Sequence, residues 1–112
     1  MRPAAAFDPG WLRHRVVIEA PVAAPDGAGG AALTWTVVAS AWALVEPVAG
    51  TERIVSGHPT GVVSHVATLR HRSDVAGGMR LLYRGRVHRV LVAYDPDGRR
   101  RYLVLKTELE TP

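Results

Sequence analysis

Short alternating runs of residues, separated by proline and glycine, constrain the fold of this chain most strongly. Leu33–Val38 alternates large apolar side chains with threonines, and Trp42–Glu46 is a second apolar run that stops before Pro47. Proline supplies no N–H to a strand ladder and pushes the residue before it away from helical conformation. No segment has a helical period long enough to compete with the period of two. We therefore predict an all-β fold, a small antiparallel β-barrel or sandwich of six to seven strands with a long inner loop.

The other predicted strands follow the same pattern. They are Arg13–Ala20, a central Val62–Arg72, Met79–Tyr83, Arg86–Asp95 and Arg101–Glu108. Arg84-Gly85 predicts a tight hairpin turn, since glycine accepts a positive φ without steric cost. Ala39–Ala41 is predicted to link two separate strands. Pro21–Ala32 is rich in glycine and proline, and this composition predicts a mobile hairpin tip.

The length of 112 residues fits a single domain, 1–112, with one core. Residues 1–12 carry two prolines and a glycine, so we expect a flexible N-terminal arm that orders against a partner. The segment 48–61 holds three glycines and a proline, and its central part, 51–56, has room for at most a turn or two of helix. We expect a long loop there. No apolar run is long enough for a membrane span or an export signal.

The sequence offers little support for catalysis. It has no cysteine, and its five histidines are scattered, so we predict no metal site and no cofactor. Ser56, His58 and Glu52 are close in sequence, but a glycine-bounded loop does not supply the rigid geometry of a catalytic triad. Gly27–Gly30 lacks the Gly-Lys-Ser/Thr ending of a phosphate loop. We predict no catalytic residues and no enzymatic activity.

Arginine supplies nearly all of the positive charge, because Lys106 is the only lysine and the formal net charge is +4. Either a preference for bidentate contacts with phosphate and carboxylate or a GC-rich genome accounts for this bias. Arginines gather in the last two predicted hairpins and indicate a local basic surface. The residues that we expect at an interface with an acidic neighbouring subunit are Arg80, Arg84, Arg86, Arg99, Arg100 and Arg101. Salt-sensitive contact with a nucleic-acid backbone remains the alternative.

The order and spacing of several short segments resemble the bacteriophage head-tail joining or head-closure (stopper) family, including its gene transfer agent relatives. The resemblance covers roughly residues 11–108. Its matching pieces are Leu12–Val16, Thr34-Trp35, Trp42 with Val45–Pro47, Gly50–Arg53, Ser64-His65 with Thr68–Arg70, and Met79-Arg80 with Leu82–Arg86. The resemblance implies a non-enzymatic, β-barrel-like domain.

The same resemblance implies a role in the neck of a virion or phage-like particle that is assembled in the bacterial cytoplasm. The chain would form a homo-oligomeric ring, a hexamer or a dodecamer, between a portal-side adaptor protein and a tail terminator or tail completion protein. The loop 48–61 would close the channel over packaged double-stranded DNA, with Arg53 and His58 nearest the DNA. A small basic barrel that binds nucleic acid non-specifically is the alternative function, and a small enzyme is the weakest one.

Overall fold

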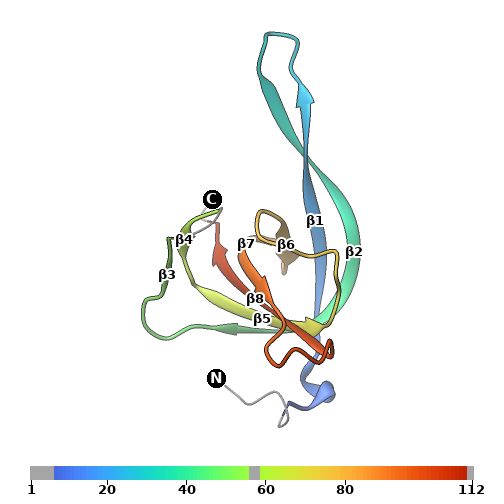
Figure 1. The fold of residues 1–112 in the computed structure, drawn as a ribbon, viewed down its shortest axis with the longest axis vertical. Helices are drawn as coiled ribbons and strands as arrows, with labels where there is room; N and C mark the ends of the chain where they lie inside the picture. The colour runs from blue at the N-terminus through green and yellow to red at the C-terminus, as the bar shows by residue number, and fades with distance from the viewer. Residues whose placement is uncertain (1–6, 56–58, 111–112) are drawn as a thin grey trace.

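The structure, a computed structural model, describes residues 7–55 and 59–110 of the chain. Six antiparallel strands form a closed barrel in the order β1-β2-β5-β8-β7-β6, and two short strands, β3 and β4, form a separate sheet (Figure 1). The predicted all-β class is confirmed, and the architecture is a barrel. The strands are β1 His14–Pro25, β2 Ala31–Pro47, β3 Arg53–Ile54, β4 Gly61–Val62, β5 His65–Arg70, β6 Arg80–Tyr83, β7 Arg86–Tyr94 and β8 Tyr102–Leu109.

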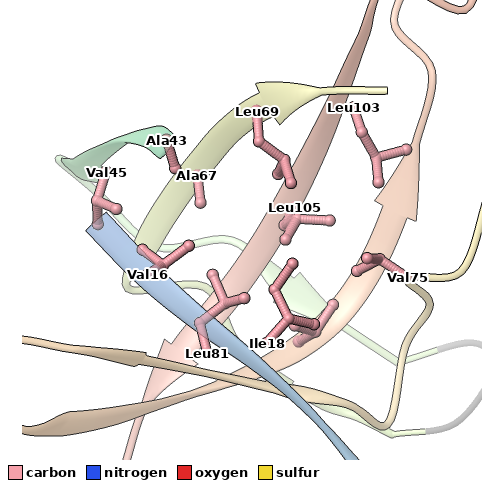
Figure 2. Close-up of a cluster of buried hydrophobic side chains, with 11 residues drawn as sticks. Val16, Ile18, Ala43, Val45, Ala67, Leu69, Val75, Leu81, Leu103 and Leu105 are labelled. Carbon is pink, nitrogen blue, oxygen red and sulfur yellow. The ribbon is translucent and has the colours of Figure 1, made fainter. Parts of the chain in front are cut away.

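The barrel closes where β1 meets β6. Only three residue pairs form this seam, with Ile18 facing Leu81 at its centre. Inward-pointing side chains from all six strands fill the interior (Figure 2). Val16 and Ile18 are fully buried, as the alternation in the first predicted strand indicates, and Leu69 and Leu105 are fully buried opposite them. The core is therefore a single cluster at the centre of the barrel.

The predicted break between two strands at Ala39–Ala41 is wrong. β2 runs without interruption for 17 residues from Ala31 to Pro47, and it ends at the proline as predicted. Small side chains at Ala39 and Ser40 permit strand geometry, and the ladder with β1 continues through them. A register shift between Ile18 and Glu19 bends the pair instead, as β-bulges do.

The hairpin tip is shorter than the predicted loop. Pro21–Pro25 and Ala31–Ala32 belong to strands, so the turn itself is limited to residues 26–30. Asp26 closes the turn, because its carboxylate accepts hydrogen bonds from the backbone N–H groups of Ala28 and Gly30 at 2.8 and 3.1 Å. The paired strands extend away from the barrel as a long ribbon and give the molecule its 52 Å length (Figure 1).

The predicted central strand Val62–Arg72 is also too long. β5 covers only His65–Arg70, while Val62 belongs to β4 in the other sheet. The chain changes sheets at Val63 and Ser64, whose N–H groups donate to the carbonyl oxygens of Glu52 and Thr107. Over residues 51–55 the structure has the short strand β3 in place of the expected helical turn, and residue 56 lies outside the described part.

Residues 7–12, the described part of the predicted N-terminal arm, lie against the barrel. Pro9–Trp11 form one turn of 3-10 helix, η2, which begins after Asp8. The Asp8 carboxylate accepts a hydrogen bond from the Gly10 N–H at 2.8 Å. The Phe7 ring packs on Tyr102 of β8, with 4.7 Å between ring centroids. The flexibility expected of residues 1–12 stays a prediction.

A core and an exposed leucine should respond very differently to truncation. We expect Leu69→Ala to lower the free energy of unfolding by about 2–5 kcal/mol, since it opens a cavity in the filled barrel. Leu33→Ala is the matched control, because Leu33 is 62% exposed in the ribbon and should change the same quantity by less than about 0.5 kcal/mol. Urea unfolding of both variants measures the difference, and equal losses would contradict the assignment of the core.

Candidate assembly surfaces and channel segment

The predicted inner loop is built around a small sheet. We call the described residues between Val48 and Val63 the flap. Within it, Arg53 of β3 faces Val62 of β4, and Ile54 faces Gly61. At the base of the flap the Val48 N–H donates to the Ser64 carbonyl at 3.0 Å. The flap is thus a narrow hairpin rather than an unstructured loop.

Side chains of β8 and β7 hold the flap on the barrel at two points. Lys106 forms an ion pair with Glu52 on the β3 side. On the β4 side, Glu108 accepts hydrogen bonds from the Val62 N–H at 3.2 Å and from Arg89 at 2.9 Å. Gly61 permits this approach, because a Cβ at its position would lie 2.7 Å from the Glu108 carboxylate and 3.0 Å from Leu91.

Of the two residues expected nearest the DNA, only Arg53 belongs to the flap as defined. Arg53 is exposed on β3 and makes no ion pair with any residue in the described part of the chain. His58 lies outside the described residues. Val55, which follows β3, is 69% exposed and is the most exposed of the large apolar side chains that the structure describes. The base of the flap is therefore fixed, while Arg53 and Val55 face solvent.

Removing the Glu108 anchor should loosen the flap without unfolding the barrel. In Glu108→Ala the Val62 N–H loses its acceptor, and Arg89 loses its acidic partner while keeping its hydrogen bond to the Thr60 carbonyl. We expect amide hydrogen exchange at Val62 to accelerate several-fold, while the exchange of the buried β5 amides stays unchanged. Glu110→Ala is the matched control, because Glu110 is exposed beyond the end of β8. Unchanged exchange at Val62 would show that Glu108 does not hold the flap.

The arginines of the last two hairpins do not form one surface. Arg84 and Arg86 lie at the turn between β6 and β7, whereas Arg99, Arg100 and Arg101 lie in the connection between β7 and β8. These are opposite ends of β7, about 25 Å apart at the rise of a strand. Arg84 has the positive φ of 52° that a tight hairpin needs, and the predicted turn is confirmed. The basic surface is thereby divided into two.

Arg80 is engaged within its own chain. Its guanidinium Nε donates to the Glu19 carboxylate at 2.7 Å, and the group lies over the Trp35 ring at 4.1 Å from the centroid. Glu19 is almost fully buried, so this pair neutralises a charge at the barrel seam. Arg80 therefore has a structural role at the base of the ribbon, which its position in the sequence did not reveal.

A basic cleft lies where the end of β5 meets the start of β8. Its volume is about 510 Å³, and it is lined by Arg70, His71, Arg100 and Arg101 beside Phe7 and Tyr102. Arg101 is paired with Asp97 at 2.7 Å, whereas the side chains of Arg70 and Arg100 form no ion pair with an acidic residue in the described part of the chain. This arrangement can receive an anion or an acidic side chain.

Sequence analysis missed a cluster of rings formed by His14, His65, His88 and Tyr83. The strand ladders bring His65 and His88 to 4.9 Å between ring centroids, and His14 lies 5.2 Å from Tyr83. Ser64 bonds to Nδ1 of His65 at 2.9 Å and accepts the Leu109 N–H at 2.7 Å. No local sequence motif predicts this cluster, because its members come from four different strands, β1, β5, β6 and β7.

The His88 side chain is poorly suited to carry a proton. It is 4% exposed, and its Nδ1 has no hydrogen-bond partner in the described part of the chain. Burial lowers the pKa of His88, and the neighbouring His65 and Arg86 lower this pKa further. Among the described residues no group of three or more histidines and carboxylates is arranged to hold a metal ion.

Acidification should therefore destabilise the fold through His88. Below the ordinary histidine pKa of about 6.5 the unfolded chain takes up a proton that folded His88 resists, so stability falls as pH falls. Between pH 7.5 and 5.0 we expect the free energy of unfolding to fall more in the wild type than in His88→Phe, which cannot titrate at this position. Urea unfolding across this range measures both, with the values at pH 7.5 as the reference. Identical pH slopes would contradict the role of His88.

Comparison with known proteins gives two findings. The family model for the phage head completion protein matches residues 7–110. A chain in the solved structure titled "Virion of native gene transfer agent (GTA) particle" has a similar fold, with a TM-score of 0.61 and 21% sequence identity, over 88% of this chain and 96% of that chain. No curated protein sequence matches significantly.

The family match spans the barrel, the ribbon and both ends of the flap. It confirms the expected kinship with phage head proteins, and it gives the chain a structural role in the head of a phage-like particle. Among the described residues no helix is long and apolar enough to cross a membrane. The chain belongs to the phage head completion protein family.

Proposed function

We propose that the chain is a ring-forming connector subunit, not an enzyme, located between a portal-side adaptor and a tail terminator or tail completion protein. It closes the DNA channel after packaging and provides the tail attachment site. The observation that carries this proposal is that the flap is fixed at its base, while Arg53 and Val55 are exposed. Family membership supports the particle context. Assembly in the bacterial cytoplasm is part of the proposal.

The construction of the flap suits a gate. Its base is tied to β8 by Glu52–Lys106 and to β7 and β8 through Glu108, so the force on its outer part is transmitted to a rigid barrel. Its own sheet has only two residue pairs, so the flap can bend at low cost while the barrel stays folded. Arg53 on β3, and His58 in sequence, supply positive or titratable groups for contact with packaged DNA.

Neighbouring copies would contact one another through the exposed turns. Arg84 and Arg86 at one end of β7, and Arg99 and Arg100 at the other, remain available for acidic neighbours, whereas Arg80 is already paired. In a hexameric or dodecameric ring every copy would present both ends of β7 in the same way. One end could then also face the adaptor and the other end the tail protein.

A second function, non-specific binding of a nucleic-acid backbone, is favoured by the basic cleft. Arg70 and Arg100 stand beside Tyr102 there, and the combination of cations with an aromatic ring is common in sites for single-stranded nucleic acids. Tyr102 is only 7% exposed, however, and cannot offer its face to a base. The cleft is better suited to phosphate or carboxylate than to base stacking.

Shortening the flap should separate channel closure from folding. Ile54 and Gly61 face each other, so residues 55–60 can be replaced by an Asn-Gly turn that closes the hairpin. In a host that produces the particles, we expect this variant to enter particles that lose packaged DNA or lack tails. Nuclease-resistant DNA and tailed particles are the two quantities measured.

Two controls accompany this variant. The thermal midpoint of the isolated protein should lie within a few degrees of the wild type, since the barrel core is untouched. Arg53→Gln keeps the flap length and tests the charge alone. Normal DNA retention and normal tails in the shortened variant would rule out the gating role.

A further inference from the structure

The ribbon formed by β1 and β2 extends beyond the barrel. β6 pairs with β1 only up to Glu19, and β5 pairs with β2 only from Ala43 onward. Residues 20–25 and 31–36 are therefore paired only with each other, and Val37 pairs with Glu19 at their base; we call residues 20–25 and 31–37 the arm. In Figure 1 the arm leaves the barrel on the side opposite to η2 and the turn between β7 and β8.

The surface of the arm is unusual for a segment in water. Leu33 and Val37 share one face and are 62% and 59% exposed, and Val22 on the other face is 45% exposed. Between Ala20 and Val45 the sequence contains one charged residue, Asp26, although 21% of the whole chain is charged. Isolated two-stranded ribbons are marginally stable, and free edges are normally protected by charged side chains. An exposed, apolar and uncharged arm is typical of a surface that binds a partner.

A groove of matching character lies on the outer face of the barrel. Its volume is about 430 Å³, and its apolar wall includes Pro47, Val48, Val66, Tyr94 and Val104. Three charged residues line it: Lys106 and Glu52 form an ion pair, and Glu46 also has an interaction partner. Volumes of this size hold drug-sized groups, and the apolar wall favours an apolar guest. The exposed leucine and valines of the arm have this chemistry.

An arm cannot reach the groove of its own chain. Leu33 in the arm and Pro47 at the groove lie near opposite ends of β2, fourteen residues apart, which is up to about 45 Å along a strand. The two surfaces can meet only between different copies. Because they are different surfaces, their contact is heterologous, and repetition of a heterologous contact generates a closed ring when the rotation permits.

We propose that the arm of one copy lies in the groove of the next copy around the ring, with Leu33 and Val37 inserted against Val48, Val66 and Val104. This contact rests on the proposed ring function and adds to it the surfaces that join neighbouring subunits. The occupant of each groove is therefore the uncharged arm of a second copy of this chain.

Cysteine cross-linking in assembled particles tests the contact directly, because the chain has no cysteine of its own. The double variant carries Leu33→Cys in the arm and Val48→Cys in the groove. Treatment of purified particles with a short bismaleimide should give a ladder of covalent oligomers, since each chain offers one arm thiol and one groove thiol. The matched control combines Leu33→Cys with Ser73→Cys, an exposed position outside the groove, and should give no ladder.

The outcomes separate the inference from the ring function. Particles that contain the double variant and retain DNA, but yield no ladder, overturn the arm contact and leave the ring function standing. Absence of the protein from wild-type particles contradicts the ring function itself. Covalent dimers from Leu33→Cys alone show that arms meet each other, which also overturns the groove assignment.

Charge in the arm provides a second test. Leu33→Asp with Val37→Asp should lower incorporation into particles by at least about tenfold, because an unpaired carboxylate resists transfer from water into an apolar groove. Both positions are exposed, so the thermal midpoint of the isolated protein should stay near that of the wild type. Leu33→Met is the conservative control and should be incorporated normally. Normal incorporation of the charged variant would overturn the proposal.

Discussion

Closure of the barrel at the seam between β1 and β6 is the constraint on which the rest of the structure depends. Three residue pairs make this seam, and at its edge Glu19 is buried beside Arg80, whose guanidinium also covers Trp35. Where the seam ends, β1 and β2 lose their outer neighbours and continue as the arm. The same ion pair thus completes the barrel and forms the base of the arm, so the rigid and the projecting parts of the molecule share one junction.

The sequence predicted those features that depend on neighbouring residues. The alternation around Val16 and Ile18 identified a buried face, Pro47 marked a strand end, and Arg84-Gly85 marked a turn, since each of these effects acts over a few residues. The continuity of β2 through Ala39 and Ser40 was missed, because these residues favour neither strand nor loop, and pairing with β1 decides the outcome. Local propensity has no access to that ladder.

In the candidate sites, too, the sequence predicted what depends on neighbouring residues and missed what depends on distant strands. The flap was located by its glycines and by Pro47, but its fixing by Lys106 and Glu108 depends on β8, about 50 residues later in the chain. The six arginines were predicted to form one surface because they are close in sequence. Five of them lie near the two opposite ends of β7, which are far apart in space. Arg80 and His88 acquired their environments from Glu19 and His65, which no spacing rule connects to them. The contacts that candidate site residues make with distant strands are therefore known only from the structure.

The ladder between β1 and β6 also determines the order of folding. Ile18 must find Leu81, and β8 must lie between β5 and β7, before the core is enclosed, so closure waits for nearly the whole chain to leave the ribosome. The hairpin of β1 and β2 needs only local contacts and forms within the first half of the chain. The topology thus allows each new subunit to form its apolar arm before its barrel can close, and exposed apolar strands at that stage favour aggregation over assembly.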